Sequence, residues 1–496
     1  MKKDKSYELY QLVQSLTPSE KKFIRRQLSK YELEQTKELL LFDLFNHHKE
    51  PEDKELKIAY QLKKYSPEYL SADKNKLYEA VLEGLSDLNA AYSNEISAND
   101  GLQKAIVLYE KKLFEQCIKQ IQKVKKQAYI FELWGLYISL LHLEQRCHRV
   151  LFQFDLAELL MQEEIEIFGK QQLLNQYASI HYKSISFRVK IGKARSGEQV
   201  SDFEKLIEQL TKLEKSNDFY PQFNRLESFC NYYFVKDELQ SEMSVNSELI
   251  SLMQNNPWYI EDNPLNYIAV RTRLLGIQRR LSPELFWESL PAFRLLPKQL
   301  SKQKQTAEVN VFIFSHTFEL DQLLLEKNWN RAFQLIEPVE KGIEKYREQI
   351  DANWLVSAVF RFAYASTFSA NYERALDYIL KLLNDFPATL RPDLNKVGLL
   401  LQILLHYELG NYRLLPSLIA NAKYHLKKND QLYGCENLLL AFFGKVARNK
   451  NEKSNLIQQY ADLLTKLQKL RQDSFEKKIF EIFDFEYWAE HKISLL

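Results

Sequence analysis

The chain has 496 residues, of which 45% are apolar and 27% are charged, as is usual for a folded protein. Its 68 lysines and arginines nearly balance 66 aspartates and glutamates, which argues against a surface built throughout for nucleic acid or anionic membrane. Because only 12 glycines and 13 prolines are available for tight turns, long helices joined by short loops are expected.

Sequence features that the chain lacks indicate its compartment and whether it holds a metal or cofactor. No stretch of about 18 apolar residues is free of charge, so a membrane span is not expected. The basic start, Met1–Lys5, is not followed by the apolar core of a signal peptide. The cysteines are far apart and form no Cys-x-x-Cys pair, which predicts neither a zinc site nor a disulfide framework. We therefore expect a reduced, cytoplasmic protein without metal or cofactor, with buried thiols at Cys117, Cys147, Cys230 and Cys435.

Residues 1–98 predict a small helical N-terminal domain. Thr17 and Glu20 form a capping-box pattern around Pro18, which suits the first position of a helix. A charged linker is expected at 49–54. The expected helices are, in order, Ser6–Gln14, one that starts at Pro18 and includes Leu28, Glu32–His47, and one through Leu77 and Leu88.

Basic residues gather on the second of these helices. Positions 22, 25 and 26 share one helical face, and several cations on a short helix can contact nucleic-acid phosphates. A solvated face opposite Phe23, Ile24 and Leu28 is the simpler interpretation, and we favour it. The candidate basic patch consists of Lys21, Lys22, Arg25 and Arg26.

Residues 99–473 carry a recurring helical-hairpin signature. A polar or small residue breaks one helix, an aromatic residue follows, and a small or apolar residue comes three places later. The copies, clearest first, are Asn371–Leu376, Asn328–Phe333, Gly410–Leu415 and Leu113–Ile118. The second helices are expected to begin about 43 residues apart, near Phe114, Val150, Ser201, Gln240, Ser282, Trp329, Tyr372, Tyr412 and Glu452.

The residue types explain how such a hairpin would pack. A small residue such as Ala332 or Ala375 lets the first helix approach closely, and Trp329 or Tyr372 fills the corner of the hairpin. Pro387 ends its helix before the next hairpin. About nine such hairpins predict an all-α superhelix, which a C-terminal helix in the aromatic-rich segment 474–496 would cap.

The signature resembles a known repeat family. Asn371–Pro387 is similar to part of the tetratricopeptide repeat, and Trp329 with Ala332 follows the same pattern. The step of about 43 exceeds the 34 residues of that family, which indicates a divergent or HEAT-like array. Ser15–Phe23 also resembles the opening of a group of uncharacterised bacterial tetratricopeptide-like proteins. The resemblance implies a superhelix whose groove binds peptides or protein partners.

Polar stripes on the predicted first helices are the candidate partner-binding positions. In a tetratricopeptide-like array the first helices line the groove, where arginine can hold a carboxylate with two hydrogen bonds. An ordinary solvated or inter-hairpin face is the alternative interpretation. The candidates recur at helical spacings: His181, Ser184 and Arg188; Asn266, Arg273 and Arg280; Arg361 and Tyr364.

Catalysis is not predicted, because no nucleophile–base pair or metal-ligand set can be assembled. Gly192–Gly197 lacks the Gly-Lys-Ser/Thr ending of a phosphate loop and is expected to be a linker. We therefore expect a non-catalytic scaffold or adaptor that binds a peptide or a partner's helix in the groove. The alternative is a regulator that binds nucleic acid through the N-terminal domain and senses a ligand or partner through the repeats.

Overall fold

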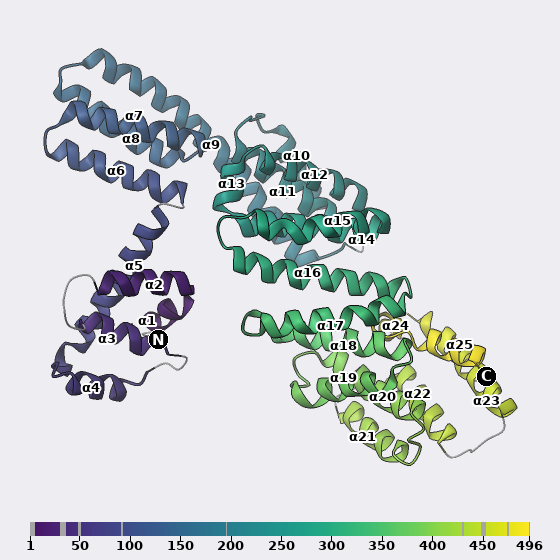
Figure 1. Ribbon diagram of the computed structural model, residues 1–496. Helices are drawn as coiled ribbons and strands as arrows, with labels where there is room; N and C mark the ends of the chain where they lie inside the picture. Colours follow the sequence, from purple (N-terminus) through teal and green to yellow (C-terminus); the bar gives the residue numbers. More distant parts are fainter. Residues whose placement is uncertain are drawn as a thin grey trace. The chain divides into compact units, whose positions relative to one another are not determined.

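The computed structural model describes residues 5–29, 36–47, 51–90, 93–194, 196–428, 431–447, 453–473 and 476–495. It is 84% helix, and the described residues form 25 α-helices that pack in neighbouring pairs and no strand, so the all-α class is confirmed. The chain divides into two compact units, Met1–Pro264 and Leu265–Leu496 (Figure 1). The boundaries expected near 98 and 473 are a different division and stay a prediction.

Unit 1 opens with five helices around a core of their own. Leu9, Leu41, Tyr60 and Leu77, from four of these helices, are fully buried in it. The predicted capping box is confirmed, because the Thr17 N–H donates to the Glu20 carboxylate at 2.7 Å. The bounds are α1 Lys5–Ser15, α2 Pro18–Leu28, α3 Lys37–Phe45, α4 Asp53–Leu62, the 3₁₀ turn η1 Pro67–Tyr69, and α5 Leu70–Ala90.

The structure differs from two of the sequence predictions for this region. The helix expected over Glu32–His47 is the shorter α3, and residues 30–35 and 48 lie outside the described part of the chain. The sequence prediction also missed α4, which begins inside the expected linker at Asp53. Glu52 precedes it, and the Glu52 N–H donates to the Glu55 carboxylate at 3.0 Å. A glutamate at this position is not a favoured N-cap type, so the start of α4 had no strong signal.

The rest of unit 1 is a succession of paired helices with one long member. Because α9 has 38 residues, its first part packs on α8 and its second on α10 and α11. The bounds are α6 Asn94–Glu110, α7 Phe114–Ile130, α8 Trp134–Val150, α9 Phe154–Ile191, α10 Glu198–Lys212, α11 Phe219–Lys236, α12 Leu239–Gln254 and α13 Pro257–Asp262.

Unit 2 continues the pairing and ends with two short helices. The single helix expected in 474–496 is interrupted at Phe483 and Asp484. The bounds are α14 Pro264–Leu281, α15 Pro283–Leu295, η2 Leu296–Gln299, α16 Lys304–Leu325, α17 Trp329–Lys345, η3 Arg347–Gln349, α18 Ala352–Phe368, α19 Tyr372–Asp385, α20 Pro392–Glu408, α21 Leu415–Lys428, α22 Gly434–Val446, α23 Lys453–Arg471, α24 Lys477–Ile482 and α25 Phe485–Leu495.

The predicted starts of the second helices agree closely with the structure. Those near Phe114, Trp329 and Tyr372 are confirmed to the residue, and Ser282 is the N-cap of α15. Others differ by one to four residues, as for α9, α10, α12, α21 and α23. The predicted starts near Val150 and Ser201 are farther apart than the other starts, because α9 runs for 38 residues between them.

One turn joins seven of the described helix pairs. Its central residue has left-handed backbone angles, and the N–H of that residue donates to the carbonyl three residues before. The next N–H donates to the carbonyl five residues before it, so the turn is a Schellman motif that satisfies the end of the first helix. In six of the seven copies the next residue is the N-cap of the second helix. The left-handed residues are Lys112, Glu132, Phe152, Asp237, Lys327, Ala370 and Gly410.

The sequence signature covers the end of this turn and the start of the second helix. Asn371 and Asn328 are the residues after the left-handed position, and their carbonyls accept hydrogen bonds from the Ala375 and Ala332 N–H groups at 3.0 Å. Both alanines are fully buried, as predicted for close helix contact. Gln153 begins a copy that the sequence prediction missed, with an aromatic residue next and a small one three places after that.

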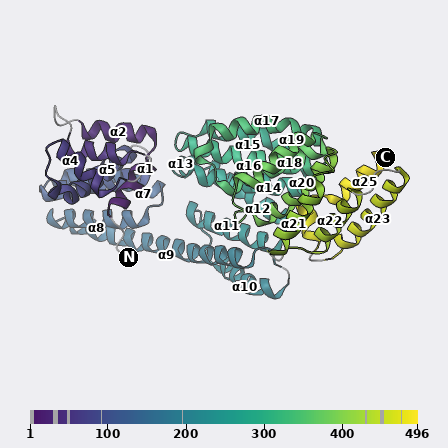
Figure 2. The ribbon, with the colours of Figure 1, turned by 90° about the horizontal axis from the view of Figure 1, so that it is seen from below.

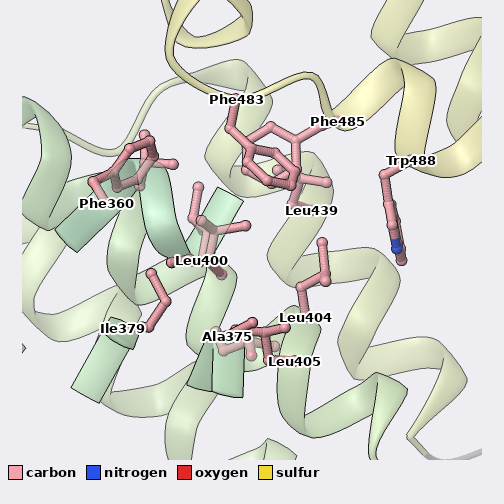
Figure 3. Close-up of a cluster of buried hydrophobic side chains, with 14 of the residues drawn as sticks. Phe360, Ala375, Ile379, Leu400, Leu404, Leu405, Leu439, Phe483, Phe485 and Trp488 are labelled. Atoms are coloured by element: carbon pink, nitrogen blue, oxygen red, sulfur yellow. The ribbon is translucent and has the colours of Figure 1, made fainter. Parts of the chain in front are cut away.

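Packing in unit 2 depends on such small residues and on the C-terminal segment. Figure 3 shows Ala375 beside leucines of α20, in the same buried cluster as Phe483, Phe485 and Trp488. Gly342 of α17 lies against the ring of Phe312, where a Cβ atom would come within 2.1 Å of the ring. A larger residue at Gly342 would therefore push the two helices apart.

The left-handed turn residue offers a direct test of stability. Ala370 has a φ of 57° and is exposed, so Ala370→Gly should raise the free energy of unfolding by about 1 kcal/mol. Gly410 occupies the same place with a φ of 73°, and Gly410→Ala should lower it by a similar amount. Urea unfolding followed by circular dichroism measures both. Changes of the same sign would contradict this role of the turn.

Candidate functional site

A pocket of about 970 Å³ lies in unit 2. The first helices of successive pairs, α14, α16, α18 and α20, supply one wall, and α23, α24 and α25 supply another. Six cationic and six anionic side chains line it together with aromatic rings. The charged lining consists of Arg279, Lys327, Arg361, Arg391, Arg471, Lys477, Asp321, Asp393, Glu481, Asp484, Glu486 and Glu490.

The C-terminal segment is held in place by aromatic contacts. The ring of Phe483 lies 4.7 Å from that of Tyr364 on α18. Tyr487 of α25 lies 5.6 Å from Trp329 of α17, and the Trp329 indole N–H donates to the Tyr487 hydroxyl at 3.3 Å. The Asp484 N–H donates to the Tyr364 hydroxyl at 3.3 Å. Residues more than 100 positions apart thus build the pocket together.

Two arginine–aspartate pairs hold fixed charge on the pocket wall. Arg361 donates from Nε and Nη2 to both oxygens of Asp321, at 2.5 and 3.3 Å. Arg391 donates to both oxygens of Asp393, at 2.9 and 2.6 Å, and its third nitrogen reaches Ser357 at 2.6 Å. The hydrogen bond from Arg391 lowers the pKa of Asp393. Such two-point pairs keep the guanidinium planes in one orientation.

Other groups in the pocket are also fixed by their surroundings. Arg471 pairs with Glu486 at 2.8 Å, and this bond raises the pKa of the arginine. Burial raises the pKa of the Tyr364 phenol, which keeps it protonated at neutral pH. The Lys327 ammonium lies 3.8 Å from the centre of the Tyr487 ring. The lining is therefore preorganised, which lowers the entropy lost when a ligand binds.

Arg279 differs from these paired arginines. Its Nε is buried and has no hydrogen-bond partner, and within the described ranges no carboxylate pairs with its guanidinium. The ring of Phe318 lies 5.7 Å from that guanidinium. A buried donor without an acceptor costs about 1–3 kcal/mol. An anionic or carbonyl group of a ligand would remove that cost.

The structure brings two predicted site residues into the pocket. Arg361 and Tyr364 line it, as expected for a later first helix. Asn266, Arg273 and Arg280 lie on α14, where Asn266 and Arg280 are exposed and Arg273 is half-buried. None of these three belongs to the pocket lining. The sequence argument chose a stripe one residue away from Arg279, about 100° around the helix.

The remaining predicted stripe lies in unit 1 and contacts α11. His181 Nδ1 lies 3.0 Å from the side-chain oxygen of Asn224. Ser184 accepts a hydrogen bond from Asn231 at 3.0 Å, and Arg188 donates to the same asparagine at 3.1 Å. These three side chains therefore join two helices of the same unit. Their role in binding a partner stays a prediction.

The predicted basic patch lies on α2. Lys22, Arg25 and Arg26 are exposed and Lys21 is half-buried. Arg25 pairs with Asp43 of α3 at 3.1 Å, which neutralises part of the patch. The apolar side chain opposite, Ile24, is fully buried, as the solvated-face interpretation requires.

Cysteine and histidine side chains form no metal site in the part of the chain that the structure describes. All four cysteines are buried, and none of them forms a disulfide within the described residues. The sulfur atoms of Cys117 and Cys147 lie 3.5 Å apart, where α7 contacts α8. This contact could not be predicted from the sequence, because the two cysteines are far apart in it. His142 instead contacts Glu164 at 2.7 Å, and His148 contacts Gln153 at 2.7 Å.

Comparison with known proteins adds no family assignment, because no protein-family model matches the chain and no curated protein matches it significantly. Among the described helices, none is long and apolar enough to cross a membrane.

Removing the anchor of the C-terminal segment should destabilise unit 2. Trp488 is buried, and its indole N–H donates to Glu408 at 2.8 Å. Trp488→Ala should lower the free energy of unfolding by about 3–5 kcal/mol. Leu495→Ala, on the same helix but 62% exposed, should change it by less than about 0.5 kcal/mol. Equal effects in urea unfolding would show that α25 does not support the pocket wall.

Proposed function

We propose that the protein is a non-catalytic adaptor that binds an extended peptide segment of a partner protein in the pocket of unit 2. We further propose that its helix pairs form a divergent tetratricopeptide-like α-solenoid. Buried cysteines without disulfides among the described residues suit a reducing compartment, and we propose that the protein is cytoplasmic. The observation that carries the proposal is the buried Arg279 Nε without a partner at the wall of a mixed polar and aromatic pocket.

The shape and origin of the pocket support peptide binding. Its volume of about 970 Å³ is at the upper end of the range for ligand pockets. Its wall comes from the first helices of four successive pairs, the surface that tetratricopeptide-like arrays use for peptides. A peptide carries backbone carbonyls, amides and side chains of both signs, which a lining of mixed charge can match.

The chemistry of the lining suggests what the peptide carries. Arg279 calls for a carboxylate or carbonyl oxygen, since a guanidinium donates several hydrogen bonds and accepts none. Trp329 and Tyr487 supply ring surface, and Tyr364 supplies a protonated hydroxyl. We therefore propose a segment with an acidic residue or a terminal carboxylate beside an apolar or aromatic one.

A second candidate is a regulator that contacts nucleic acid through α2. The exposure of Lys22, Arg25 and Arg26 supports it. The pairing of Arg25 with Asp43 weakens it, because a paired arginine releases fewer counterions from a phosphate backbone. Salt-sensitive retention on DNA or RNA that disappears when Lys21, Lys22, Arg25 and Arg26 become Ala would favour this candidate over the adaptor.

The adaptor proposal predicts a difference between two adjacent arginines. Arg279→Glu places a carboxylate where we propose that the ligand's oxygen binds, and it should weaken partner binding at least about tenfold. Arg280→Glu makes the same change in charge at an exposed neighbour outside the pocket, and it should leave binding unchanged. Immobilised wild-type and variant proteins are compared by affinity capture from native extract, followed by titration of the captured partner.

Circular dichroism must show equal helicity for the three proteins. Loss of the partner in both arginine variants, or in neither, would contradict a role for the pocket. Loss in Arg280→Glu alone would instead favour the stripe of Asn266, Arg273 and Arg280.

A further inference from the structure

The longest helix of unit 1 carries an apolar stripe that no described part of that unit covers. With 38 residues at 1.5 Å per residue, α9 extends about 57 Å. Figure 2 shows it as one continuous helix. Every seventh residue from 154 to 189 is exposed, and five of these six are large and apolar. The stripe consists of Phe154, Met161, Phe168, Asn175, Tyr182 and Val189.

In the second half of α9 this stripe lies opposite the face that the helix uses within unit 1, and in the first half it borders that face. Ala157 and Ile167 are buried in the first half of the helix, and Tyr177, Ile180 and Ser184 in the second, against α8, α10 and α11. A helix with two apolar faces requires two partners. A seven-residue repeat is the pattern by which one helix packs along another in a coiled coil.

The turn that precedes α9 adds an independent observation. Phe152 holds a left-handed φ of 58°, which is unfavourable for a bulky residue, and its side chain is 81% exposed. Its ring lies 6.2 Å from that of Phe154, at the end of the stripe. The hydrogen bonds of the Schellman turn and the ring contact with Phe154 offset part of this strain, but most of the Phe152 side chain stays exposed. A surface that buries both rings on association would add further contacts.

The charges along α9 indicate what covers the stripe. In the first half, Asp155 and Glu158 are exposed, and in the second half Lys183 and Lys190 are exposed. A second copy of the same helix in antiparallel orientation would place the acidic half of each beside the basic half of the other. A parallel copy would place acidic residues beside acidic ones, which costs energy.

We propose that α9 is a self-association surface through which two copies of this chain pair antiparallel. Phe154 of one copy then lies beside Val189 of the other, Met161 beside Tyr182, and Phe168 beside Asn175. Asp155 comes close to Lys190 of the second copy. The seam also contains the polar residues Gln172 and Ser179, so the affinity is moderate and the dimer depends on concentration. This inference is independent of the function proposed for unit 2.

Sedimentation of the full chain at several concentrations tests the dimer. Wild-type protein should approach twice its mass of 58.9 kDa as concentration rises. Phe168→Glu, at the centre of the stripe, should weaken association at least about tenfold. Leu159→Glu is the matched control, because Leu159 is 64% exposed but lies on another side of α9, and it should leave association unchanged.

A wild-type chain that stays monomeric at all concentrations would overturn the proposal, and so would a dimer that Phe168→Glu leaves intact. Circular dichroism of the two variants controls for folding. Tight binding of a basic amphipathic peptide by a monomeric wild-type chain would identify another occupant for the stripe and would also overturn the proposal.

Cysteine cross-linking tests the orientation. Under a mild oxidant, Met161→Cys combined with Tyr182→Cys should form a covalent dimer, because these positions lie side by side in the antiparallel pair. Met161→Cys alone should not. The four native thiols are buried, so the wild-type chain is a suitable blank. A covalent dimer of the single variant would indicate a parallel pair and overturn the antiparallel arrangement.

Discussion

The short left-handed turn is the constraint on which most of the helix pairing depends. It ends one helix, supplies the cap of the next, and leaves only two or three residues between them in six of its seven described copies. Helices joined so tightly must lie side by side, and their contact face must then hold small residues. Ala332 and Ala375 are fully buried for this reason. Only one copy has glycine at the left-handed position, and the others each accept a cost of about 1–2 kcal/mol.

Two helices that do not begin at such a turn, α11 and α22, receive hydrogen bonds at their first residues from distant parts of the chain. The carboxylate of Glu132 accepts hydrogen bonds from the Phe219 and Tyr220 N–H groups at the start of α11. Glu476 accepts from Gly434 and Cys435 at the start of α22, at 2.7 and 3.1 Å. Negative charge at a helix N-terminus is favourable, and these contacts connect successive pairs. Burial raises the pKa of Glu132, so the cap weakens as the pH falls toward that raised value.

Much of this fold could be predicted because its determinants are local. The Asn371 signature, the alanine three places after Tyr372 and the capping box at Thr17 each reflect a hydrogen bond or a contact within a few residues. The pocket could not be predicted in the same way, since Trp329 and Tyr487 come into contact only when α24 and α25 fold back against α17. Periodicity could select Arg361 as a polar residue of a first helix. On α14 the seven-residue spacing selected Arg280 instead of Arg279, because polar stripes through these two residues differ by only one position in the sequence.

The length of α9 and the exposure of its stripe have the same physical origin. A Schellman turn near residue 172 would have divided the helix into two that pack on each other, and the stripe would then have been an internal contact. Without that turn the two halves cannot fold back, so Met161 and Tyr182 remain about 32 Å apart along one axis. A second helix of similar length can cover both at once. The acidic first half and the basic second half of α9 make a reversed copy of itself the best match in charge.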